Sequence, residues 1–186
     1  MEKFYKNSKG FTLVELLVVI ATFVVITITA VDLFVLMIAH QRTILAEQEL
    51  LSQVSYVTEY MSRALRMAEK SADTNCLSQI GKNYEITRFG KGVKFINASN
   101  QGACQEFFLD EDAGAIKEIE NNETPVPLTS ESLIIDKFNI KLYGDNAGDE
   151  AQPRIIIAMD IGRQTKNAQV RKQVQLTISQ RNLDEL

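Results

Sequence analysis

The residues of this chain best suited to chemistry lie near its N-terminus, where a glycine and a carboxylate flank the start of a long apolar run. The segment from Phe11 to Ala39 holds only two charged side chains, Glu15 and Asp32. Gly10 precedes this segment and offers a protease a backbone without an obstructing side chain. Cleavage after Gly10 would leave a new ammonium group on Phe11, and Glu15 would follow about 6 Å further along a helix.

An apolar segment of this length admits three interpretations. A cleaved secretory signal has an apolar core of only about 7–15 residues, and the run here is too long for one. A plain membrane anchor needs about 20 apolar residues, but it gives Glu15 no partner, and a charge at the bilayer centre costs at least about 2.5–3.5 kcal/mol. Glu15 could simply extend to the membrane interface. In a bundle of parallel, staggered helices it could instead meet the Phe11 amine of another chain, and that pairing would favour one register.

Type IV prepilins and type II secretion pseudopilins begin with a pattern that this chain closely resembles, in Lys9-Gly10-Phe11-Thr12-Leu13-Val14-Glu15-Leu16-Leu17-Val18-Val19-Ile20-Ala21. The resemblance implies cleavage between Gly10 and Phe11 by a prepilin peptidase, and N-methylation of Phe11. It implies a role for Glu15 in subunit assembly. The implied partners are other pilin or pseudopilin subunits, the peptidase and methyltransferase, and an inner-membrane assembly platform.

Asp32 separates this chain from many major pilins, which carry a helix-distorting proline around this position. The difference favours a minor pilin or pseudopilin. Asp32 would lie about 31 Å along a helix from Phe11, near the outer membrane surface. A polar contact inside a helix bundle, or with His40 or Arg42 of a neighbour, is the alternative. The run from Val174 to Asn182 also resembles the closing strand of larger J- or W-type minor pseudopilins.

No glycine or proline interrupts the chain between Gly10 and Gly81, and these are the two residues that break helices. From Leu50 to Ala68, apolar residues recur every three or four positions, which is typical of one buried helix face. We therefore predict one helix from about Phe11 to about Lys70. Its first half would lie in a membrane or against partner helices, and its second half against its own domain.

After Ser71, short runs of strand-forming residues alternate with turn residues. An apolar helix face needs an apolar surface to cover, and a sheet face supplies one. We predict an α+β, pilin-like fold in which the long helix packs on an antiparallel sheet. The candidate strands are Tyr84–Arg88, Gly92–Asn97, Cys104–Asp110, Ala115–Ile119, Leu133–Tyr143, Arg154–Ile161 and Val170–Gln180, with a hairpin turn at residues 111–114.

The chain is expected to have three parts. Residues 1–10 would be a cleaved basic leader, and residues 11–39 the transmembrane or filament-core half of the helix. Residues 40–186 would be an extracytoplasmic globular domain, with an amphipathic helix half over 40–70 and a β-rich part over 71–186. Lysines in the leader would hold the N-terminus in the cytoplasm. This predicts a single-pass membrane protein that enters a cell-surface or periplasm-spanning filament after assembly.

The two cysteines, Cys76 and Cys104, both follow the apolar segment, so they can pair in an oxidising compartment outside the membrane. A disulfide would attach the loop after the helix to a strand and add about 3–4 kcal/mol of stability. Two reduced thiols are the alternative if that compartment is not oxidising.

The sequence lacks the residues that common catalytic sites need. His40 is the only histidine and lies at the membrane edge, so no triad base is present. No cysteine and histidine cluster suits zinc. An acidic loop offers oxygen ligands for calcium, but its spacing is not that of a defined motif, and a solvated turn is favoured. We expect neither enzymatic activity nor a cofactor. The loop residues are Asp145, Asn146, Asp149 and Glu150.

The chain carries a net charge of −4, with three of its basic and one of its acidic residues in positions 1–10, which leaves −6 for the remainder. Without a large basic field, nucleic-acid binding is not expected. A filament subunit is the favoured function. A membrane-anchored binding or adhesion protein is one alternative, and a DNA-uptake minor pilin is another. The basic candidates for DNA contact are Arg154, Arg163, Lys166, Arg171 and Lys172.

Overall fold

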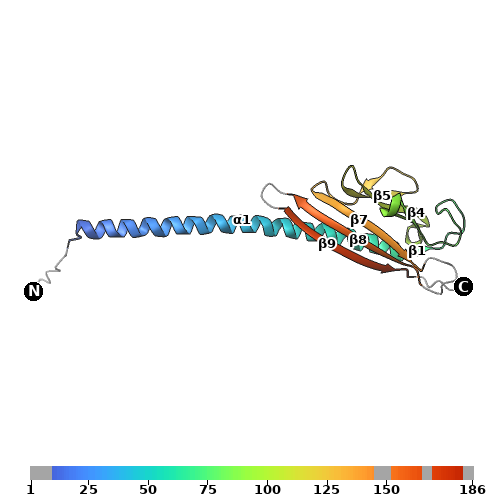
Figure 1. The fold of residues 1–186 in the computed structure, drawn as a ribbon, viewed down its shortest axis with the longest axis horizontal. Coiled ribbons are helices and arrows are strands. Elements are labelled where there is room, and N and C mark those ends of the chain that lie inside the picture. Colours follow the sequence, from blue (N-terminus) through green and yellow to red (C-terminus); the bar gives the residue numbers. More distant parts are fainter. Residues whose placement is uncertain (1–9, 145–151, 165–168, 182–186) are drawn as a thin grey trace, which may run out of the picture. The chain divides into compact units, whose positions relative to one another are not determined.

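The computed structural model describes residues 10–144, 152–164 and 169–181. It contains one long helix followed by strands in two antiparallel sheets, which is the predicted α+β, pilin-like architecture (Figure 1). Helix α1 extends from Leu13 to Arg66. The chain divides into two compact units between Ile44 and Leu45, inside α1.

The first unit consists of α1 up to Ile44 and the residues before it. Every side chain from Phe11 to Ile44 is exposed, although most of them are apolar. This part of the helix is long and apolar enough to cross a membrane. The described part of the chain therefore leaves this large apolar surface uncovered.

The second unit begins with the amphipathic part of α1. Leu50, Val57, Met61 and Leu65 are almost completely buried, at successive spacings of seven, four and four residues. This buried face confirms the predicted stripe. Glu49 and Glu47 lie on the more exposed side and form ion pairs with Arg163 and Lys172 of the last two strands.

The helix ends at Arg66, four residues before the predicted end near Lys70. The chain instead forms strand β1 (Ala68–Glu69), which pairs with strand β3. Met67 N–H donates to Ala64 O (3.0 Å), and Met67 O accepts from Ala98 N–H (2.9 Å). Strand pairing thus ends the helix where no glycine or proline does, because tertiary hydrogen bonds outweigh local helix propensity.

The first sheet has six strands in the order β1-β3-β4-β5-β6, and β2 pairs with β3 beside β1. All of its pairs are antiparallel. Asp110 pairs with Ala115, which confirms the predicted hairpin at residues 111–114. The strands after β1 are β2 (Tyr84–Thr87), β3 (Gly92–Asn97), β4 (Ala103–Asp110), β5 (Ala115–Glu120) and β6 (Val126–Pro127).

The second sheet has three long antiparallel strands in chain order: β7 (Leu133–Tyr143), β8 (Arg154–Gln164) and β9 (Gln169–Ser179). A single sheet is expected from the sequence, so the division into two sheets is a correction. Sequence periodicity shows which segments are strands but not which strands pair. β1 and β6 are not among the predicted strands, because a two-residue strand has no period to detect.

The core lies where α1 and both sheets meet. Phe95, Phe107 and Phe138 are buried, and the rings of Phe95 and Phe107 lie 5.5 Å apart. The hydroxyl of the buried Tyr84 donates to Leu65 O (2.7 Å). That bond satisfies a carbonyl in the last turn of α1, where no backbone partner remains. It fixes the end of the helix against β2.

A buried polar network also connects α1 to the first sheet. Tyr60 on α1 donates its hydroxyl to the carboxylate of Glu118 on β5, at 3.0 and 3.1 Å from the two oxygens. Gln105 Nε2 donates to the same carboxylate (2.6 Å), and Asn97 Nδ2 donates to Gln105 Oε1 (2.7 Å). Burial raises the pKa of Glu118 above its ordinary value of 4.5, although these hydrogen bonds oppose the rise. Burial, followed by the bond to Glu118, raises the pKa of Tyr60 to about 12.

The raised pKa of Glu118 predicts a pH dependence of stability. The folded state binds its proton more tightly than the unfolded state, so this carboxyl contributes most below about pH 4.5. Its contribution decreases as the pH rises through the folded-state pKa. Glu118→Gln keeps an acceptor and a donor in place but cannot titrate. The free energy of unfolding of Glu118→Gln minus that of the wild type should therefore increase between pH 4 and pH 7, measured by urea denaturation of the full chain in detergent.

Glu123→Gln is the matched control, because Glu123 is an exposed acid in the turn after β5. Its difference from the wild type should not follow this pH trend. A difference for Glu118→Gln that is the same at every pH would contradict the prediction.

Candidate functional site at the start of the apolar helix

The Gly10–Phe11 peptide bond lies on exposed backbone just before α1. A Cβ atom added at Gly10 would meet nothing within 4 Å, and the φ angle of Gly10 is not positive. The folded chain therefore does not require a glycine at this position. A requirement for one would have to come from an enzyme that acts on this bond.

Thr12 begins the helix by capping it. Glu15 N–H donates to Thr12 Oγ1 (3.3 Å), and Leu16 N–H donates to Thr12 O (3.2 Å). Thr12 and Glu15 thus have the spacing of a capping box, in which a hydroxyl satisfies a free N–H of the first turn. The Thr-x-x-Glu spacing was available in the sequence, and the sequence analysis missed it. The cap fixes Glu15 three residues into the helix, close to Phe11.

The threonine hydroxyls inside the apolar segment form hydrogen bonds within their own helix. Thr22, Thr27 and Thr29 each donate to a helix carbonyl four residues earlier, at 2.8–3.2 Å. Such bonds remove the cost of placing a hydroxyl in an apolar environment. The polar groups that the segment leaves for outside partners are therefore its two carboxylates.

Glu15 and Asp32 have no side-chain partner within the part of the chain that the structure describes. Both are exposed, as are His40 and Arg42 further along α1. A carboxylate in apolar surroundings is costly unless a positive group pairs with it. Phe11 would provide an amine four residues from Glu15 if the chain began there.

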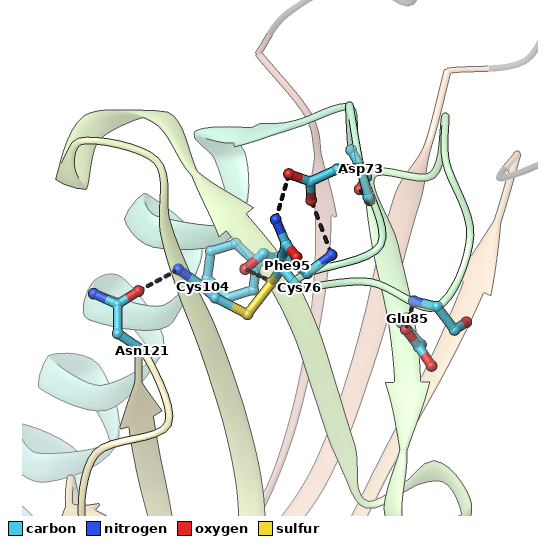
Figure 2. Close-up of a disulfide and its surroundings, with 9 residues drawn as sticks. Asp73, Cys76, Glu85, Phe95, Cys104 and Asn121 are labelled. Atoms are coloured by element: carbon cyan, nitrogen blue, oxygen red, sulfur yellow. Dashed lines mark hydrogen bonds between the residues drawn. A yellow bond between two sulfur atoms is a disulfide. The ribbon is translucent and has the colours of Figure 1, made fainter.

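The second predicted site, the cysteine pair, forms a disulfide in the structure. Figure 2 shows Cys76, in the loop after β1, bonded to Cys104 on β4, with the two Cα atoms 5.5 Å apart. Cys104 N–H donates to Asn121 Oδ1 (3.0 Å), so the turn after β5 joins the same corner (Figure 2). The bond attaches a loop without strands or helices to β4, an interior strand of the first sheet that pairs with both β3 and β5.

Other contacts hold this loop, which comprises residues 70–83. The side chain of Leu77 is fully buried. The carboxylate of Asp73 accepts from Asn75 N–H (2.9 Å), and Glu85 on β2 accepts from Ser78 N–H (2.7 Å) (Figure 2). At the base of the loop, Ser71 N–H donates to Lys82 O (2.9 Å). The disulfide therefore attaches the middle of a loop whose two ends are already held by hydrogen bonds.

The remaining predicted sites receive little support. The acidic loop with Asp145, Asn146, Asp149 and Glu150 lies outside the described residues. Among the residues that are described, no group of three or more histidine, cysteine or acidic side chains could hold a metal ion.

The basic residues considered for DNA contact are largely neutralised. Arg163 pairs with Glu49, Lys172 with Glu47, and Arg171 with Asp136 at 2.7 Å. Arg154 is exposed, and Lys166 lies outside the described residues. Three of the five candidates thus face a carboxylate of the same chain, which does not favour a phosphate-binding strip.

Comparison with protein families gives one match, the prokaryotic N-terminal methylation motif, over residues 5–31. The match covers the basic stretch, the Gly10–Phe11 bond, Glu15 and most of the apolar segment. It supports the type IV prepilin and pseudopilin family. Comparison with curated proteins and with solved structures finds no match.

The disulfide is predicted to stabilise the globular unit. Replacing both cysteines, in Cys76→Ser/Cys104→Ser, should lower the free energy of unfolding by about 3–4 kcal/mol. Without the cross-link, the unfolded chain regains the conformational entropy that loop closure had removed. Urea denaturation of the full chain in detergent measures this difference. Dithiothreitol should destabilise the wild type by a similar amount and leave the double variant unchanged. Equal stability of the reduced and oxidised wild type would contradict the prediction.

Proposed function

We propose that this chain is a minor pilin or pseudopilin, cleaved at the Gly10–Phe11 bond, methylated on Phe11, and assembled into a filament through α1. The proposal is based on two observations taken together. The methylation motif over residues 5–31 coincides with a helix whose apolar side chains are all exposed up to Ile44. A motif that prepares the N-terminus and a surface that needs neighbours are what an assembling subunit requires.

In this proposal the chain has the three parts expected from its sequence. Residues 1–10 are the leader, removed on the cytoplasmic side. Residues 11–39 cross the membrane before assembly and form the filament core afterwards. Residues 40–186 lie outside the cytoplasm, where the Cys76–Cys104 disulfide is compatible with an oxidising compartment. The chain is then a substrate of the peptidase and methyltransferase and has no catalysis of its own.

Assembly exchanges one apolar environment for another. In the membrane, lipid covers the side chains from Phe11 to Ala39, and in the filament neighbouring helices cover them. Because both environments are apolar, the exchange is close to balanced, and small specific terms decide it. The pairing of Glu15 with the Phe11 amine of a neighbour is such a term, since it neutralises two charges at once. It also selects one axial register from many that are equally apolar.

Cleavage is predicted to depend on Gly10 although folding does not. Gly10→Val adds a side chain where the structure has open space, so the variant should fold and insert normally. It should nevertheless keep residues 1–10, because the branched side chain obstructs the peptidase. Mass spectrometry of the membrane-extracted chain should find the wild type starting at Phe11 with an added methyl group.

Ala21→Val is the control, because it places the same side chain at an exposed position of α1, eleven residues after Gly10. It should be processed like the wild type. A wild-type chain that keeps Met1 would instead identify a membrane-anchored binding protein, and normal cleavage of Gly10→Val would exclude the assigned cut site.

Filament incorporation is predicted to depend on Glu15. Glu15→Val removes a charge from the apolar segment, so membrane insertion should be unimpaired. Incorporation into filaments should fall at least about tenfold, which corresponds to losing about 1.4 kcal/mol of pairing. The measurement compares chain in sheared filaments with chain in membranes. Thr22→Val, which removes a self-satisfied hydroxyl from the same segment, should incorporate normally. Undiminished incorporation of Glu15→Val would refute the role of this carboxylate.

A further inference from the structure

The second sheet ends in a long strand whose outer edge is open. Of the strands that the structure describes, only β8 pairs with β9. An open groove of about 1010 Å³ lies between the C-terminal half of β9 and α1. Inward and outward residues of β9 both line it, namely Leu176, Thr177 and Ser179, and Arg181 after the strand lines it as well. The edge of the strand, with its backbone N–H and C=O groups, therefore borders the groove.

The groove is positively charged on a chain that is acidic overall. Three arginines line it, Arg63, Arg66 and Arg181, against the single carboxylate of Glu59. Glu59 already pairs with Arg63 (2.6 Å). Within the described part of the chain, no side-chain partner is found for Arg66 or Arg181, and both are exposed. The groove can therefore accept a segment with two carboxylates.

Two contacts with α1 give the direction of β9. The side chain of Lys172, early in β9, pairs with Glu47, and Arg181 N–H donates to Arg66 O (2.9 Å) at the end of α1. The strand thus runs in the same direction as the helix (Figure 1). Residues 182–186 follow directly from one end of the groove. Their sequence is Asn182-Leu183-Asp184-Glu185-Leu186, which combines two acids with two leucines.

We infer that the groove receives residues 182–186 of a second copy of this chain, extended along the open edge of β9. The strand edge provides backbone hydrogen bonds, as in other cases where a peptide adds a strand to a sheet. Arg66 and Arg181 pair with Asp184 and Glu185. The leucines lie against the apolar residues that line the groove, Met67 and Leu176.

A second copy suits the groove better than the chain's own residues. Gln180 N–H and Arg181 N–H are already bonded to Pro153 O (3.3 Å) and Arg66 O. To enter its own groove, the chain would have to reverse immediately, and a tight turn at Asn182 and Leu183 would leave only Asp184, Glu185 and Leu186 of this segment to pair. A copy shifted along α1 toward the helix N-terminus carries all five residues past the groove, over up to about 17 Å. The inference rests on the proposed function, because a filament provides parallel copies with such a shift.

Cysteine cross-linking between two tagged full-length chains in one membrane tests this contact. One chain carries Ser55→Cys in the groove and the other Leu183→Cys, and the two native cysteines are bonded to each other. We expect a disulfide-linked pair on a non-reducing gel. The control replaces Ser55→Cys by Glu123→Cys, at an exposed turn of the first sheet, and should give no pair. Arg66→Glu should lower the yield about fivefold, and Asp184→Arg in the other chain should restore it.

Each result decides the inference. A pair no more abundant than the control overturns it. A chain that carries both substitutions and links only to itself also overturns it, because the groove would then hold its own chain. Mass spectrometry of the N-terminus separates this contact from the proposed function. A mature, methylated Phe11 without a cross-link overturns the groove contact alone, and a cross-linked pair with intact leaders supports the contact while it overturns the filament role.

Discussion

The apolar surface of α1 between Phe11 and Ile44 imposes the main constraint on this protein, because no residue that the structure describes covers it. So many exposed leucine, isoleucine, valine and phenylalanine side chains are unstable in water. Lipid or other helices must cover them. The polar groups of the segment agree with this environment: its threonines bond to their own helix, and Thr12 caps the first turn. Up to Ala39, Glu15 and Asp32 are the exceptions, and a carboxylate in apolar surroundings is costly unless a positive group pairs with it.

In the second unit, by contrast, one side of α1 is buried and the other side is left open. A stripe of residues from Leu50 to Leu65 packs into the core, and each end of this stretch has a polar attachment. Ion pairs from Glu47 and Glu49 hold it near the start, and the bond from Tyr84 to Leu65 O holds it near the end. Between them, the buried carboxylate of Glu118 accepts from Tyr60. Because Glu118 must find donors wherever it is buried, this bond also fixes the rotation of the helix on the sheet.

The sequence predicted the elements of this fold better than their assembly. Seven strands and the β4–β5 hairpin were recognisable because alternation and turn residues are local signals. The helix end at Arg66 was not, since it depends on Ala68 pairing with Asn97 about thirty residues later. The two sheets, the groove beside β9 and the Tyr60–Glu118 bond depend on contacts distant in sequence as well. At the N-terminus the reverse holds: Gly10, Phe11 and Glu15 are close in sequence, so the sequence alone identified the candidate site, and the structure added the cap by Thr12.

The Cys76–Cys104 bond determines how far the chain can extend if it is pulled by its N-terminus. Force that enters through α1 and continues along the backbone passes from Cys76 directly to Cys104 through the sulfur atoms. The residues between them, which include β2 and β3, bear no tension. These 27 residues therefore cannot lengthen under load, and the greatest extension of the chain is shortened by about 90 Å. The strands that cover the end of the helix are in this way protected from the pull that the helix transmits.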